Sequence, residues 1–312
     1  MIGKLTCALA IFALPATAQD LDETGCKAFW NTVTPMAADI DMLVPVARAI
    51  TARDGWCEAT DITFETPFTR GVETSIEAIR WRGDDLATAA AAGIFPTSLE
   101  IEVENIRNIP QTTDAVLDYV FRVQNLRAGI DGQLATTWDA QTQSFQLKTL
   151  DFSFASGDGV QITGRAEKVD LADPGGQMAI AAKAELHEVG INLRNEHGNL
   201  FEFLILSPMA NLLLTRETSP DQQVAALKTQ ALAVIDALPE DAFPPDTRFA
   251  LAELVEDMPN PNGSFTLDIA FDPGFGMEAA RKTADILTST GIPANWRDAV
   301  VTARYDRKPI PR

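Results

Sequence analysis

The chain has 312 residues, of which 46% are hydrophobic and 22% charged, and its 44 acidic and 25 basic side chains give a formal net charge of -19 at pH 7. This composition is typical of a globular protein and excludes a disordered or collagen-like chain. The negative charge also argues against nucleic-acid binding, because a protein of that class needs a basic surface to displace counterions from the phosphate backbone. We therefore expect no nucleic-acid partner.

The N-terminus has the pattern of a Sec-type signal peptide, covering residues 1–18. Lys4 precedes an apolar stretch over residues 5–14, and a triplet of small residues follows at 16–18. The apolar stretch is too short to span a bilayer, which needs about 20 residues, and no apolar run of about 18 residues occurs later in the chain. We expect cleavage between Ala18 and Gln19, a periplasmic location, and no membrane span in the mature chain.

Two cysteines remain after removal of the signal peptide, Cys26 and Cys57. An even number of cysteines in an oxidising compartment predicts a disulfide between them. An unbroken helix from one to the other would hold them roughly 45 Å apart, whereas bridged Cα atoms lie about 4.4 to 6.8 Å apart. The chain must therefore double back within a segment of largely helical spacing. Pro35 and Pro45 are natural break points, and we expect one of them to mark the reversal.

Hydrophobic periodicity divides the mature chain into three regions. Residues 19–57 have helical spacing, residues 58–198 have mainly the period of two that is typical of half-buried strands, and residues 199–312 mix helices with strands. The phase of the alternation slips near Thr149, which predicts a β-bulge, because otherwise later side chains would point to the wrong face. A second change of phase occurs near His187.

The expected elements follow in chain order from these patterns. Strands are expected around 62–76 and 100–104, with a short helix over 84–93 between them, and a β-meander over 133–171 is followed by a strand over 178–184. After an apolar block at 200–214, we expect a helix capped by Ser219, with Pro220 at its first position, and a shorter helix from Pro244. A strand over 265–271, a helix over 277–288 and a strand over 301–305 complete the chain.

This order of elements predicts the α+β fold class. We expect a large antiparallel meander sheet with helices packed on it, and an N-terminal helical segment held by the disulfide. In this scheme residues 58–198 form the β-rich region and residues 199–312 pack on the sheet.

No motif in the chain predicts an enzyme. The only histidines, His187 and His197, lack metal-ligand spacing, and the sequence contains neither a Gly-x-Ser-x-Gly elbow nor a phosphate-binding glycine loop. We therefore predict a protein without catalytic residues, cofactor or metal site. The alternative is a carboxylate-dependent hydrolase that calcium could assist, although Glu100, Glu102 and Glu104 are expected to form a solvated strand face.

The apolar segment from Phe201 to Leu214 is the strongest candidate for ligand binding. Only Glu202, Ser207 and Asn211 clearly interrupt it, so a helix here is either buried between layers or lines an apolar cavity. The leading hypothesis is a non-catalytic protein that binds an apolar, lipid-like ligand or an envelope protein partner, through the sheet or through this segment. The ligand-binding residues expected in the segment are Phe201, Phe203, Leu204, Leu206 and Met209.

Several motifs carry a resemblance to known groups of proteins. They are the signal peptide, the early cysteine, Ile-Arg-Trp-Arg-Gly at 79–83, Gly-Gln-Leu-x-x-x-Trp-Asp at 132–139 and Gly-Ile-Asn-Leu-Arg at 190–194. Together they resemble uncharacterised secreted proteins of alphaproteobacteria, and faintly AsmA-type envelope proteins. The first resemblance implies a periplasmic location, and the second implies lipid handling. Neither assigns functional residues.

The signal peptide and the disulfide make one joint prediction about mass. The exported protein should begin at Gln19 and weigh two hydrogens less than the fully reduced mature chain. Intact mass spectrometry before and after reduction measures both properties. A chain that retains residues 1–18, or a mass that reduction leaves unchanged, would contradict the corresponding part.

Overall fold

A computed structural model describes most of the chain. The described residues are 22–38, 44–65, 72–92, 94–110, 114–125, 129–172, 183–198, 200, 201, 206, 210, 214, 219–276 and 298–308.

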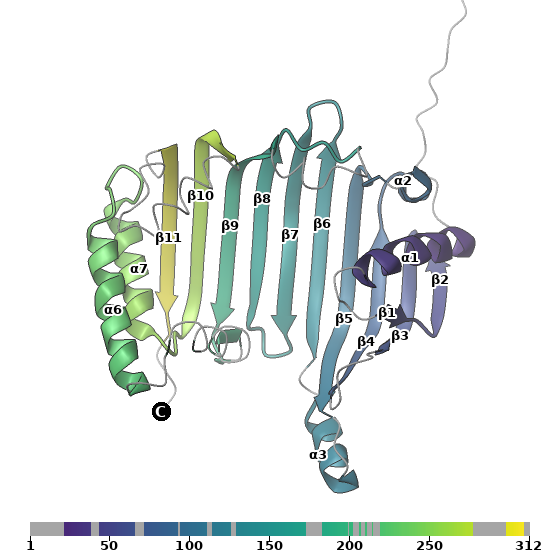
Figure 1. Cartoon of the computed structure of the whole chain (residues 1–312), viewed down its shortest axis with the longest axis horizontal. Helices are drawn as coiled ribbons and strands as arrows, with labels where there is room; N and C mark the ends of the chain where they lie inside the picture. The colour runs from purple at the N-terminus through teal and green to yellow at the C-terminus, as the bar shows by residue number, and fades with distance from the viewer. Residues whose placement is uncertain are drawn as a thin grey trace, which may run out of the picture.

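One antiparallel sheet of eleven strands organises the described residues (Figure 1). The strands lie side by side in the order β1-β3-β4-β5-β6-β7-β8-β9-β10-β11, with β2 also paired to β3, so that from β3 onward each strand pairs with the next one along the chain. The predicted large antiparallel meander is confirmed. The strands are β1 (Val44–Val46), β2 (Ala49–Arg53), β3 (Trp56–Glu65), β4 (Val72–Arg82), β5 (Ser98–Pro110), β6 (Ile130–Asp139), β7 (Ser144–Phe154), β8 (Gly159–Glu167), β9 (Glu185–Asn195), β10 (Gly263–Gly276) and β11 (Ala299–Arg307).

Five helices accompany the sheet in the described part of the chain. In Figure 1, α1 lies at the β1–β4 end, α6 and α7 lie beyond β11, and α3 projects past the end of β5. The contacts agree, since α1 packs on β1, β2 and β3, and α7 packs on β11. The helices are α1 (Glu23–Ala38), α2 (Leu86–Ala92), α3 (Ala115–Asn125), α6 (Pro220–Asp236) and α7 (Pro245–Asp257).

Strand register places apolar and polar side chains on opposite faces of the sheet. Because side chains alternate along a strand, each row of paired residues belongs to one face. One row across β3 to β11 is entirely apolar, and the next row is entirely polar. The apolar row is Cys57, Trp81, Ile101, Leu134, Leu150, Ile162, Ile191, Leu267 and Ala303. The polar row is Glu58, Arg80, Glu102, Gln133, Asp151, Gln161, Asn192, Thr266 and Arg304.

Local irregularities keep the two faces distinct along the strands. The register of β7 shifts between Leu147 and Leu150, which confirms the predicted bulge near Thr149. The register of β9 shifts where His187 has no partner, so the second change of phase is also a bulge. Asp61 of β3 and Asn105 of β5 have positive φ and interrupt the alternation of their strands. The apolar residues on both sides of each still pack on one cluster, which includes Cys57 and Trp81. Each irregularity compensates a change of phase in the sequence.

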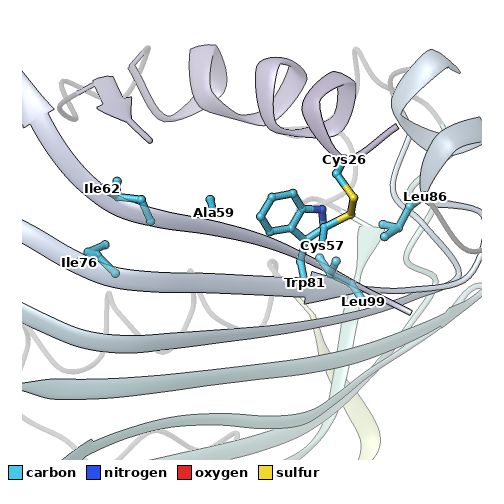
Figure 2. Packing of buried hydrophobic residues seen from close by; sticks show 8 residues of the cluster. All are labelled: Cys26, Cys57, Ala59, Ile62, Ile76, Trp81, Leu86 and Leu99. Atoms are coloured by element: carbon cyan, nitrogen blue, oxygen red, sulfur yellow. A yellow bond between two sulfur atoms is a disulfide. The ribbon is translucent and has the colours of Figure 1, made fainter. Parts of the chain in front are cut away.

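The disulfide fastens α1 to the first strands of the sheet. Cys26 of α1 and Cys57 of β3 are bonded with their Cα atoms 5.5 Å apart, and both are buried. Figure 2 shows Trp81 next to this bond, beneath α1. Phe29 and Trp30 of α1 stack on its indole ring with centroids 6.0 and 5.8 Å away. The predicted disulfide therefore belongs to the packed core at this end of the sheet.

Helix α7 covers the outer edge of β11. The hydroxyl of Thr247, a buried residue, donates to the carbonyl of Val301 at 3.1 Å and accepts from the amide of Ala303 at 3.1 Å. Just before the helix, the carbonyl of Ala242 accepts from the amide of Val301 at 2.9 Å. These bonds satisfy backbone groups that would otherwise be open to pairing with another strand.

A tyrosine links the end of β11 to the end of α7. The Tyr305 hydroxyl donates to the Asp257 carboxylate at 2.8 Å and accepts from the Asn262 amide at 3.1 Å. Burial, reinforced by the bond to Asp257, raises the pKa of Tyr305 to about 12. The phenol therefore stays protonated near neutral pH and keeps this bond.

The structure corrects three expectations from the sequence. Among the described residues of the predicted helical segment 19–57, only α1 is helical. It runs through Pro35, while β2 and β3 form a hairpin around Asp54 and Gly55. Both turn residues have positive φ, as a type I′ turn requires, so this Asp-Gly pair was a hairpin signal. Ser219 precedes α6, as expected, but its side chain makes no capping bond.

The C-terminal region also differs from the expectation. Strands β10 and β11 complete the sheet rather than pack on it, and of the elements described in this region the helices α6 and α7 lie outside it. Helix α3 was not predicted, although Asp114 marks its start by accepting from the amides of Val116 and Leu117. Most of the strand expected over 178–184, and the whole helix expected over 277–288, lie outside the described residues.

Removing the disulfide should destabilise the protein by about 3 to 4 kcal/mol, the effect expected for closing a loop of this length. The Cys26→Ala/Cys57→Ala double variant and the native protein can be compared by urea unfolding. Addition of a reductant should lower the midpoint of the native protein only. Equal stability of the two proteins would contradict the prediction.

The edge cover makes a second stability prediction. Thr247→Val should cost about 1 to 3 kcal/mol, because it leaves the Ala303 amide and the Val301 carbonyl unpaired in a buried place. Thr247→Ser keeps the hydroxyl and should cost less. Urea unfolding gives the stabilities, and amide hydrogen exchange at Ala303 should accelerate only in the valine variant. If the two variants behave alike, the hydroxyl is not what protects the edge.

Candidate functional site

The centre of the apolar face is the first candidate site. In the described part of the chain, α1 and α7 pack at the two ends of the sheet, and no helix packs extensively against β6, β7, β8 or β9. Leu134, Leu150, Ile162 and Ile191 in this region are only partly buried, and Phe152 of the neighbouring row is 36% exposed. We call the side chains of the apolar row on β6–β9, together with Phe152, the central apolar surface.

The neighbouring rows extend this surface along the strands. One adjacent row contains Val103, Gly132, Phe152, Val160 and Leu193, and in it Gly132 lies against the Phe152 ring, which a Cβ would approach at 3.5 Å. With about 4.8 Å between strands, the apolar row from β3 to β11 extends roughly 38 Å. The hydrocarbon core of a whole bilayer is about 30 Å thick, so this row is longer than one extended acyl chain.

A small cavity next to α6 and α7 is the second candidate site. Ten apolar residues and one lysine, Lys228, line it. The apolar residues are Phe201, Leu206, Ala210, Leu214, Val224, Leu227, Ala231, Val255, Met258 and Pro259. We call this cavity the α6–α7 pocket.

The α6–α7 pocket has a volume of about 290 Å³, close to the lower limit of roughly 300 Å³ for ligand pockets. A separate hollow of about 370 Å³ lies on the polar face of the sheet, around Gly190.

The structure places two of the five predicted ligand-binding residues in this pocket. Phe201 is buried, with 4% of its surface exposed, and its amide donates to the Asn195 side chain at 3.1 Å. Leu206 is partly buried and also lines the pocket. Phe203, Leu204 and Met209 lie outside the described residues. The segment therefore contributes to an apolar cavity.

The acidic residues considered for a hydrolase form ion pairs on the polar face. Arg80 donates to Glu58 at 2.7 Å and pairs with Glu104 at 2.7 Å and with Glu102 at 3.8 Å. The hydrogen bond that Arg80 donates to Glu58, together with the three negative charges, raises the pKa of Arg80. Glu100 pairs with the neighbouring Arg82. The predicted glutamate face exists, and its carboxylates bind arginines across strands.

The two histidines lie at separate places on the sheet. His187 is the unpaired residue of the β9 bulge, and its Nε2 lies 3.5 Å from a Glu167 carboxylate oxygen. His197 follows β9, where the fully buried Asp158 accepts from its amide at 3.0 Å and from the Glu196 amide at 2.7 Å. Asp158 thus orders the turn after β9, a role that the sequence analysis did not predict.

The described residues contain no group of three or more His, Cys, Asp or Glu side chains arranged to hold a metal ion. Among the helices described, none is long and apolar enough to cross a membrane. Comparison of the chain with protein-family models gave no match, and comparison with curated proteins gave none either.

The sequence analysis named the sheet as a possible binding surface, but it did not identify the residues of the central apolar surface. The alternation of Leu150, Ile162 and Ile191 was visible, but alternation within a strand does not reveal which residues become neighbours on adjacent strands. The sequence signal for this surface is the pair of phase changes near Thr149 and His187, because a bulge at each of them returns the later side chains to the same face.

Proposed function

We propose that this protein binds an apolar, lipid-like ligand in the periplasm, with the acyl chains lying on the central apolar surface. The observation that carries the proposal is the unbroken apolar row across nine strands, whose central members are partly exposed. Burial of apolar surface is favourable by roughly 25 cal/mol per Å², so the free energy falls when hydrocarbon covers these side chains.

The chemistry of this surface favours hydrocarbon over a protein partner. Leu134, Leu150, Ile162 and Ile191 offer no hydrogen-bonding side chain, and the strand backbone around them is paired within the sheet. Protein interfaces typically combine an apolar centre with a polar rim and about one hydrogen bond per 100–200 Å². An acyl chain requires no such bonds, so an extended row of aliphatic side chains suits it.

The first test is to identify what the protein carries. Native mass spectrometry of the protein purified from the periplasm, followed by denaturing extraction and lipid analysis, should reveal a stoichiometric lipid. A protein that carries no lipid, and that binds none from vesicles of its host's phospholipids, would contradict the proposal.

A pair of variants on one strand tests the location of the ligand. Ile162→Gln places an amide on the central apolar surface and should weaken lipid binding by about 1 to 3 kcal/mol, or roughly 5- to 150-fold. Thr163→Gln introduces the same side chain at the next residue, on the polar face, and should bind lipid as the native protein does. Equal binding by the two variants would show that the ligand does not lie on this face.

A further inference from the structure

We propose that the α6–α7 pocket is a second ligand site, which takes a single-chain fatty acid whose carboxylate pairs with Lys228. None of the residues that line this pocket belongs to a strand of the sheet. The inference therefore goes beyond the proposed function, and it can fail while lipid binding on the central apolar surface holds.

Lys228 is held at the wall of the pocket by the end of α7. Its Nζ donates to the carbonyl oxygens of Glu256 at 2.6 Å and of Met258 at 2.9 Å. Met258 also lines the pocket, so this bond places the ammonium beside the cavity. An ammonium has three donors, which leaves one for a ligand.

The charge of Lys228 has no carboxylate partner among the described residues. Its bonds are to backbone carbonyls, whereas Lys27, Lys168 and Lys308 each pair with a glutamate. A cation at the wall of an otherwise apolar pocket is complementary to an amphiphile with an anionic end.

The number of donors and the volume together select the ligand class. One free ammonium donor suits a singly charged carboxylate, whereas phosphate recognition usually recruits several donors. A cavity of about 290 Å³ is at the small end for ligand sites, which favours one chain over the two or more chains of a membrane phospholipid.

Calorimetry on the delipidated full chain tests this inference with decanoic acid, decanol and methyl decanoate near neutral pH. Decanoate should bind at least about tenfold more tightly than decanol or the ester, because only the acid forms a charge-assisted bond. Equal affinities for the three probes, or no binding of any of them, would overturn the inference. Co-purified lipid on the sheet would remain a separate result.

Two matched lysine variants locate the effect. Lys228→Met keeps an unbranched side chain without the charge, and should bind decanoate no better than decanol. Lys148→Met removes an exposed lysine of β7 that is remote from the pocket in sequence, and should keep the native preference. A preference for decanoate that persists in Lys228→Met would overturn the assignment. If Lys228→Met does not fold, the comparison of acid with ester on the native protein still decides the question.

Discussion

The structure depends on one constraint, which is that side chains of one polarity stay on one face across all the strands from β3 to β11. A slip of one residue in any strand would bring polar groups to the apolar face. The bulges at Lys148 and His187 prevent this, because each absorbs the extra residue where the sequence changes phase. The extended apolar surface exists only because these local irregularities preserve the register.

The two ends of the sheet are closed by different means. At the first strands, the Cys26–Cys57 disulfide and the aromatic stack on Trp81 hold α1 against the apolar face. At the last strand, Thr247 satisfies the outer backbone groups of β11, so that α7 takes the place that another strand could occupy. Both devices lie at the ends, and no helix in the described part of the chain packs extensively on the middle of the apolar face.

Charged side chains on the opposite face of the sheet form ion pairs between strands. Arg80, Arg82 and Arg165 each pair with glutamates of neighbouring strands, so these charges link the strands. Lys228 differs from these residues. Although the chain has a net charge of -19, no described carboxylate pairs with Lys228, which bonds to backbone carbonyls. This contrast separates structural ion pairs from a charge that is available to a ligand.

The sequence by itself determined the α+β class, the meander, the disulfide and the bulge near Thr149, because alternation, cysteine count and phase are local properties. It also indicated that Phe201 and Leu206 belong to an apolar environment. Only the tertiary structure decided that Leu134, Leu150, Ile162 and Ile191 form one row, and that Lys228 meets the end of α7. Such neighbours come from strands and helices distant in the chain, and their pairing depends on register and packing, which periodicity within one segment does not specify.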